Sequence, residues 1–182
     1  MKKAIFLDRD GTLIRDKGVI SNQNQVELYP FAIDALRKMQ KHFLLFIVTN
    51  QSGIADGKVK SKNVTDVNRY LVALLKKKGC RIQDVYCCPH NKADACKCRK
   101  PNPYFLKKAA RDYNIDLRSS FVVGDHPSDA MLAVNAGASS VYVLTGHGKR
   151  HRRDLLFLNT KICKDLGFAA RYIVSEHHHS IV

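Results

Sequence analysis

The stretch AIFLDRDGT, from Ala4 to Thr12, decides the fold class. Ala4–Leu7 is a short apolar run of the kind that forms a buried strand, and it stops at Asp8. Asp8 and Asp10 lie two residues apart, so their side chains point the same way in extended backbone. Gly11 then allows a sharp turn. Two adjacent carboxylates repel unless a cation lies between them, and Mg²⁺ suits oxygen ligands and phosphate chemistry.

Apolar runs and helical patterns alternate along most of the chain. This alternation predicts a doubly wound, Rossmann-like α/β fold with a mainly parallel sheet and helices on both faces. The expected strands are Ala4–Leu7, Phe43–Val48, Ile82–Tyr86, Phe121–Val123 and Ser140–Leu144. The expected helices are Phe31–Lys41, Asn63–Lys78, Pro103–Tyr113 and Ser128–Asn135. After Lys149 the pattern weakens, and it predicts a helix over Leu155–Leu166 and a short strand over Arg171–Val174.

Polar residues follow the predicted strands where each strand ends. They are Asp8 and Asp10, Thr49 and Asn50, and Asp125 and Asp129. In an open α/β sheet, ligands bind beyond the carboxyl ends of the strands. An aspartate that caps a helix or a turn would explain each acid alone, but not all of them together. We therefore expect one site at this edge, with Asp125 completing the magnesium ligands.

Length and composition fit one domain over residues 1–182, with a minimal cap and a flexible tail over residues 175–182. Lys and Arg number 31 against 16 Asp and Glu, a net charge of +15 that favours anionic partners. Solvated lysine faces are the alternative explanation of this charge. No signal peptide and no membrane-length apolar run is visible, so we expect a cytoplasmic protein, a monomer without membrane contact.

The loop over residues 86–101, YCCPHNKADACKCRKP, concentrates soft metal ligands. Cys88, His90, Cys96 and Cys98 supply three thiolates and one imidazole, the closed ligand set of structural zinc. Free thiols are an alternative, as is a disulfide, which a reducing cytoplasm disfavours. Because Cys98 is followed by Arg99-Lys100, a metal that holds Cys98 would also position both cations.

Four motifs together carry a family resemblance: DRDGT, TNQSG, CRKP and GDHPSD. Their order and separations resemble those of the haloacid dehalogenase-like phosphohydrolases over roughly Lys2 to Gly148. Within that superfamily the chain looks most like the heptose bisphosphate phosphatases and the related histidinol-phosphate phosphatases. AIFLDRDGT, VTNQSGIADGK and the cysteine loop carry this closer match.

The resemblance implies a role for each motif. Asp8 is the expected nucleophile, which forms an aspartyl-phosphate, and Asp10 is the expected general acid and then base. Asp8, the backbone carbonyl of Asp10 and Asp125 are expected to hold Mg²⁺. The expected phosphate contacts are Thr49, the backbone amide of Asn50 and Lys100, whose charge neutralises the transferring group.

Four further positions have expected roles around this centre. The resemblance implies that Ser52 and Arg99 contact the substrate, Arg99 beyond the reacting phosphate. Asp129 is expected to orient Lys100 or a metal-bound water. His126 follows Asp125 where many relatives carry a lysine or another polar residue; it either tunes the site or serves as a turn residue before a helix.

The expected substrate is a small phosphorylated metabolite, a heptose 1,7-bisphosphate that loses its 7-phosphate. Histidinol phosphate is the alternative, since the five-residue spacer between His90 and Cys96 resembles that family. A nucleic-acid 3′-phosphatase would suit the net charge of +15. Against it, the chain has no Trp and no basic patch interleaved with aromatic residues, so we do not expect nucleic acid as the partner.

Overall fold

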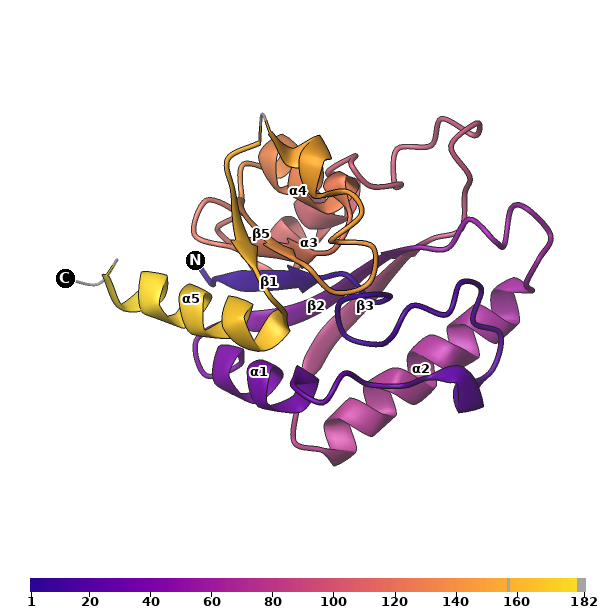
Figure 1. Ribbon diagram of the computed structural model, residues 1–182, viewed down its shortest axis with the longest axis horizontal. Helices are drawn as coiled ribbons and strands as arrows, with labels where there is room; N and C mark the ends of the chain where they lie inside the picture. Colours follow the sequence, from indigo (N-terminus) through magenta and orange to yellow (C-terminus); the bar gives the residue numbers. More distant parts are fainter. Residues whose placement is uncertain (157, 180–182) are drawn as a thin grey trace.

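The computed structural model describes residues 1–156 and 158–179 as a parallel sheet covered by helices on both faces (Figure 1). The strand order is β3-β2-β1-β4-β5-β6. The strands are β1 (Ala4–Leu7), β2 (Leu44–Asn50), β3 (Ile82–Cys88), β4 (Phe121–Gly124), β5 (Ser139–Val143) and β6 (Thr160–Cys163). All neighbouring strands pair in parallel. The predicted doubly wound α/β fold is confirmed.

The described residues also form five α-helices and two short 3-10 helices; all but α5, which follows β6, lie between strands. The helices are α1 (Ala32–Met39), α2 (Ser61–Lys77), α3 (Tyr104–Tyr113), α4 (Pro127–Ala136) and α5 (Leu166–His179), with η1 (Gln23–Gln25) and η2 (Arg152–Leu155). Helices α1, α2 and α5 cover one face of the sheet, and α3 and α4 cover the other. Across the described residues, no helix is both long and apolar enough to cross a membrane.

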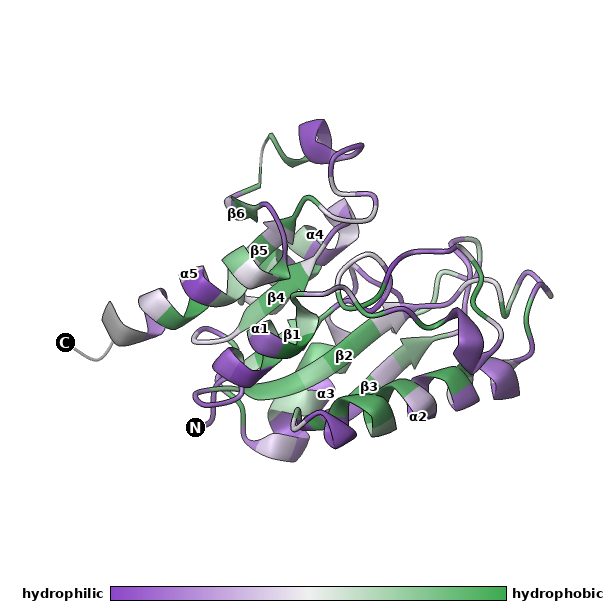
Figure 2. Cartoon of the chain, turned by 60° about the horizontal axis from the view of Figure 1, so that its bottom comes forward, coloured by the Kyte–Doolittle hydropathy of each residue, from purple (hydrophilic) through white to green (hydrophobic). Residues whose placement is uncertain are grey.

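The alternation of side chains along β1 explains why both faces are covered. Ile5 and Leu7 belong to the core under α1, α2 and α5, whereas Ala4 and Phe6 belong to the core under α3 and α4. All four side chains are fully buried. A central parallel strand therefore reads as a continuous apolar run, and Figure 2 shows the inner strands coloured as hydrophobic along their length.

Two predictions for the C-terminal third are wrong. The helix predicted over Leu155–Leu166 is replaced, in the described residues, by the end of η2 and by β6, which extends the sheet beside β5. Leu155, Leu158 and Ile162 have the spacing of one face of a helix, but they belong to separate segments. All three pack against the same small core around Tyr142, which explains their apolar character.

The strand predicted over Arg171–Val174 is wrong because these residues lie within α5. Leu166, Ala169, Ala170 and Ile173 form the buried stripe of that helix, which packs beside α1. Residues 175–179, the first part of the predicted flexible tail, belong to α5. The rest of that prediction, residues 180–182, lies outside the described residues.

Candidate active site

The carboxyl ends of β1, β2 and β4 surround a cavity of about 170 Å³. Its lining residues are Asp8, Asp10, Thr49, Asn50, Arg99, Lys100, Asp125, His126, Ser128, Asp129 and His147. The parallel register places these strand ends side by side, since Leu7 is paired with both Ile47 and Val123. The structure thus brings together polar residues that the sequence places at separate strand ends.

Three buried carboxylates meet in this cavity. One oxygen from each of Asp8, Asp125 and Asp129 lies within 4.8 Å of the others. Burial raises the pKa of Asp8 to about 7, although the charge of Lys100 opposes that shift. Burial also raises the pKa of Asp125 to about 8, and the charges of Asp8 and Asp129 add to the effect. A bound cation favours the ionised forms, and a set of oxygen donors fits Mg²⁺.

Glycines make room for the Asp125 carboxylate. Gly11 has a φ of 82°, and a Cβ there would lie 2.2 Å from Asp125 Oδ2. A Cβ on Gly146 would lie 2.1 Å from the same oxygen, so the connection between β5 and η2 also requires a residue without a side chain at this point. The backbone N–H of His147 donates to Asp125 Oδ2 at 2.7 Å. The carboxylate is thereby held between the β1 turn and the segment after β5.

Lys100 supplies a buried cation to the same cluster. Its ammonium Nζ lies 2.6 Å from Asp8 Oδ1 and 2.7 Å from Asp129 Oδ1, and it donates to Val48 O at 3.0 Å. Burial alone would lower the pKa of Lys100, but the charges of Asp129 and Asp8 raise it above its usual value. Lys100 therefore stays charged between Asp8 and Asp129 and forms an ion pair with each.

Asn50 holds the backbone of Lys100 in place. Its side-chain Oδ1 accepts from Lys100 N at 3.1 Å, and its Nδ2 donates to Lys100 O at 3.3 Å. Residue 50 is also paired with Cys88 in the sheet, so the end of β2 contacts both the beginning and the end of the cysteine loop. The peptide bond between Lys100 and Pro101 is cis.

The Asp10 carboxylate lines the same cavity but is not one of the three carboxylates that cluster together. Arg9 donates to it from Nε and Nη2, each at 3.0 Å, and Gln51 Nε2 donates to its Oδ2 at 2.8 Å. Gln51 Nε2 also donates to Thr49 Oγ1 at 2.8 Å. Thr49, an expected phosphate contact, and Asp10, the expected general acid, therefore share one amide donor.

The predicted zinc ligands lie together in space. The sulfur atoms of Cys88, Cys96 and Cys98 are 3.3–3.6 Å apart, and His90 Nδ1 lies 3.4 Å from the sulfur of Cys98 and 3.7 Å from that of Cys88. Tetrahedral zinc with bonds of about 2.3 Å to sulfur places its ligand atoms about 3.7 Å apart. The cluster is consistent with a structural zinc ion. The prediction that these four residues come together in one loop is confirmed.

Ionisation of the thiols also bears on this site. Burial opposes ionisation of Cys96, but hydrogen bonds from the backbone N–H groups of Cys98 and Arg99 lower its pKa to about 7. Burial raises the pKa of Cys88. Zinc binds thiolates, so metal binding would offset the free-energy cost of ionising the buried Cys88 thiol.

Further hydrogen bonds connect the loop to its surroundings. Arg99 Nη1 donates to His90 O at 2.9 Å, and Asn102 Nδ2 donates to Cys96 O at 2.9 Å. Arg99 and Lys100 thus lie on the cavity wall with the ligand cluster behind them. Ser52 does not line the described cavity; it is half-buried, and its carbonyl accepts from Asp56 N at 3.0 Å.

Known proteins resemble the chain over most of its length. It is 38% identical over 161 residues to the D-glycero-beta-D-manno-heptose-1,7-bisphosphate 7-phosphatase of Pasteurella multocida, covering 85% of this chain and 87% of that protein. It is 39% identical over 153 residues to the enzyme of the same name from Escherichia coli, covering 79% of this chain and 80% of that protein. A family model described as HAD-hydrolase-like matches residues 97–169. The chain belongs to the haloacid dehalogenase-like phosphatase family.

Solved structures of this phosphatase family agree with the assignment. The D,D-heptose 1,7-bisphosphate phosphatase of B. bronchiseptica, complexed with magnesium and phosphate, aligns with a TM-score of 0.87 at 30% identity. The alignment covers 96% of this chain and 99% of that one. The corresponding enzyme from Burkholderia thailandensis aligns with a TM-score of 0.73 at 26% identity over 96% of this chain and 99% of that one.

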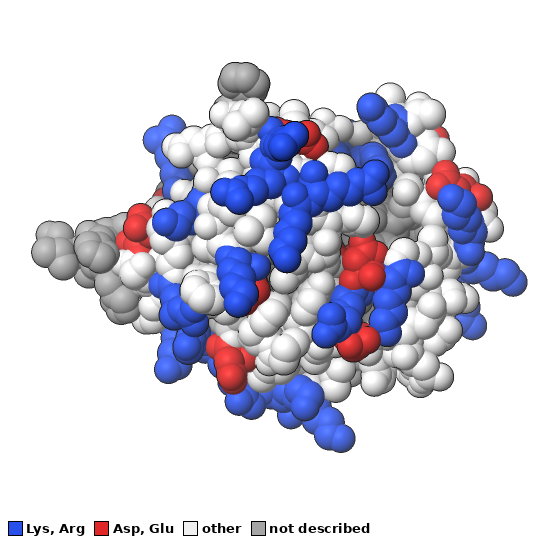
Figure 3. Space-filling model, viewed as in Figure 1, with Lys and Arg blue, Asp and Glu red and all other residues white. Residues whose placement is uncertain are grey.

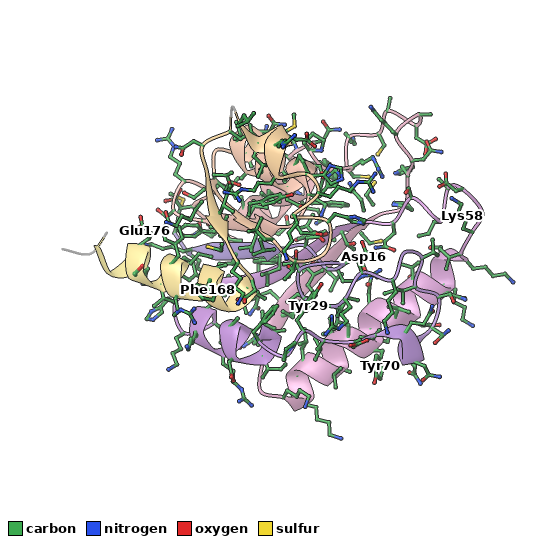
Figure 4. The ribbon with its side chains drawn as sticks, in the orientation of Figure 1. Asp16, Tyr29, Lys58, Tyr70, Phe168 and Glu176 are labelled. Atoms are coloured by element: carbon green, nitrogen blue, oxygen red, sulfur yellow. The ribbon has the colours of Figure 1, made fainter. Side chains whose placement is uncertain are left out.

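Sequence reasoning missed several residues that complete this phosphatase site. Arg9 and Gln51 lie inside the quoted motifs, but nothing in their spacing shows that both contact Asp10. His147 belongs to the segment after β5, where no motif marks it. Its ring Nε2 lies 2.8 Å from Asp16 Oδ2. Asp16, labelled in Figure 4, comes from the segment between β1 and α1, so this pair joins two loops at the cavity rim.

Proposed function

We propose that the protein is a Mg²⁺-dependent phosphatase that removes the 7-phosphate of a D-glycero-D-manno-heptose 1,7-bisphosphate through an aspartyl-phosphate. The observation that carries the proposal is the buried arrangement of Asp8, Asp125, Asp129 and Lys100 at the strand ends. Relatives that share most of the chain are named as heptose bisphosphate 7-phosphatases, which supports this substrate.

The first step transfers the phosphoryl group to the protein. A carboxylate oxygen of Asp8 attacks phosphorus, and the bond between phosphorus and the sugar oxygen breaks. Asp10 gives its proton to that oxygen, so the sugar leaves as a neutral alcohol. The ammonium of Lys100, which lies 2.6 Å from Asp8, stabilises negative charge on the group in transfer.

The second step hydrolyses the intermediate. Asp10, now a carboxylate, takes a proton from water, and the water oxygen attacks phosphorus. The bond to Asp8 breaks, which restores the Asp8 carboxylate and releases inorganic phosphate. Asp8, the backbone carbonyl of Asp10 and Asp125 would hold Mg²⁺, and the ion supplies charge stabilisation for both displacements. Thr49 and the Asn50 backbone amide contact phosphate oxygens in this proposal.

The rest of the sugar has room beside the cavity. A groove of about 560 Å³ runs between the cysteine loop and α4, and it shares Arg99, Lys100 and His126 with the cavity. Arg99 and Lys92 supply cations along it, and Pro127 and Met131 supply an apolar wall. We place the sugar and its second phosphate in this groove, where Arg99 contributes to substrate recognition. Ser52 lines neither the groove nor the cavity, so its proposed contact with the substrate rests on the family resemblance.

The same proposal covers the organisation of the chain. Residues 1–182 form a single catalytic domain that acts as a cytoplasmic monomer, and nucleic acid is not its partner. On the face seen in Figure 3, Lys and Arg side chains gather near the top, and elsewhere they are interspersed with Asp and Glu side chains. A polyanion track requires a continuous basic groove with aromatic stacking platforms.

A substrate panel tests the proposal. The purified protein with Mg²⁺ is assayed for phosphate release from both anomers of heptose 1,7-bisphosphate, from histidinol phosphate, from other sugar phosphates and from 3′-phosphorylated oligonucleotides. We expect the highest kcat/KM for a heptose bisphosphate. A preference for histidinol phosphate or for an oligonucleotide would replace the proposed substrate. An Asp8→Asn variant with undiminished activity would refute the proposed aspartyl-phosphate mechanism.

A further inference from the structure

Arg9 is a fully buried cation directly after the proposed nucleophile. Its relative exposure is 0%, so water cannot satisfy its guanidinium donors. Nε and Nη2 donate to the two oxygens of Asp10, each at 3.0 Å, and Nη1 donates to Asn68 Oδ1 at 2.7 Å. A buried charge is stable only when it is paired and hydrogen-bonded. Asp10 and Asn68 therefore account for the placement of this side chain.

Asn68 is the exception on the buried stripe of α2. The other buried residues of the helix are Val64, Val67, Leu71 and Leu75, all apolar. Asn68 lies four residues after Val64 and three before Leu71, so its side chain faces the sheet with theirs. Only 8% of it is exposed. A polar side chain in such a stripe is costly unless it is hydrogen-bonded, and the 2.7 Å contact to Arg9 satisfies it.

Two planar groups determine the orientation of the Asp10 carboxylate. The forked guanidinium of Arg9 contacts both oxygens, which fixes the plane of the carboxylate as well as its distance. The Gln51 amide adds a donor to Oδ2 at 2.8 Å. Arg9 can hold this orientation only if its own plane is fixed, and Asn68 supplies the contact at the far end of the guanidinium.

We propose that Asn68 is a positioning residue that acts through Arg9 to aim Asp10 at the leaving oxygen. The inference rests on the proposed function, in which Asp10 is the general acid. General acid–base catalysis contributes about 10²- to 10⁴-fold, and displacement by about 1 Å can remove much of that gain. Loss of the Asn68 contact therefore lowers the rate of any step that needs the Asp10 proton and leaves other steps unchanged.

Leaving-group dependence separates this role from a structural one. The value of kcat/KM is measured for heptose 1,7-bisphosphate and for 4-nitrophenyl phosphate, because kcat/KM reports the step in which the ester bond breaks. A sugar alkoxide needs a proton to leave, whereas 4-nitrophenolate is a weak base and leaves without one. We expect Asn68→Ala to lower kcat/KM about 10-fold for the sugar phosphate and less than about 2-fold for the aryl phosphate.

Matched variants make the result decisive. Asn63→Ala, on the same helix but outside its buried stripe, should change neither value. Arg9→Lys keeps the positive charge but lacks the fork, so it should show the same selective loss even if Asn68→Ala fails to fold. In an Asp10→Asn background, Asn68→Ala should cause no further loss, since its effect passes through Asp10.

Each contrary result has its own meaning. An equal loss for both substrates in Asn68→Ala and Arg9→Lys would show a general structural effect and overturn the positioning role. If Asp10→Asn lowers kcat/KM selectively for the sugar phosphate but Asn68→Ala and Arg9→Lys do not, the positioning role is overturned while Asp10 remains the acid. Absence of any selective loss in Asp10→Asn would overturn the proposed acid itself, and the positioning role with it.

Discussion

Replacement of Lys100 by Met removes the only cation that contacts Asp8 among the described residues. Lys100 is 6% exposed and lies 2.6 Å from Asp8 Oδ1 and 2.7 Å from Asp129 Oδ1. Methionine keeps an unbranched chain of similar reach but leaves both buried carboxylates without a compensating cation. Breaking a buried ion pair in this way costs about 3–5 kcal/mol of stability. We expect Lys100→Met to lower the free energy of unfolding of the metal-free protein by about that amount.

The loss should depend on pH in a defined direction. Burial already raises the pKa of Asp8 to about 7, and Lys100 opposes this rise. Without Lys100 the pKa of Asp8 is higher still, so the folded state holds its proton over a wider range than the unfolded state. Stability then falls as pH rises through that range, because the unfolded state binds fewer protons. We therefore expect a larger destabilisation at about pH 8 than at about pH 5.

Urea denaturation of the metal-free wild type and of Lys100→Met, at both pH values, measures the free energy of unfolding of each protein. Lys107→Met, an exposed position on α3, is the control and should stay within about 0.5 kcal/mol of wild type. With Mg²⁺ present, kcat should fall about 10²- to 10³-fold, as for loss of one transition-state donor. A variant as stable as wild type, or one destabilised more at the lower pH, would show that the ion pairs do not carry the stated energy.

The remaining predictions concern the nucleophile, the metals and one glycine. Asp8→Asn should abolish turnover while circular dichroism shows an intact fold, and substantial activity in the folded variant would exclude Asp8 as the nucleophile. Cys98→Ser should lose zinc by elemental analysis and about 10²-fold in kcat while most of the melting transition survives; full activity without zinc would make the loop a bystander. Gly11→Ala should weaken Mg²⁺ binding measured by calorimetry, since its Cβ would lie 2.2 Å from Asp125 Oδ2 at a φ of 82°; unchanged affinity would count against the site. Because burial raises the pKa of Asp125 to about 8, protons compete with Mg²⁺ for the site, and the apparent Kd for Mg²⁺ should rise as pH falls below that value; a Kd independent of pH would contradict this.

The sequence by itself determined the features that depend on local periodicity and on short motifs. Continuous apolar runs such as Ala4–Leu7 identify central parallel strands, because both faces of those strands are covered. The acids at the strand ends and the ligands of the cysteine loop could be located for the same reason: parallel strands end at one edge, and Cys88 to Cys98 are close enough in the chain to meet around one ion.

Only the tertiary structure decided which side chains meet across long separations. Arg9 contacts Asn68, and Asn50 holds the backbone of Lys100, because the packing of α2 and the register of β2 bring them together. Likewise β6 and α5 lie where helical spacing from Leu155 predicted a different arrangement. A buried Asn in an apolar stripe indicates that a partner exists, but the partner's identity depends on contacts between elements, and local periodicity carries no information about those.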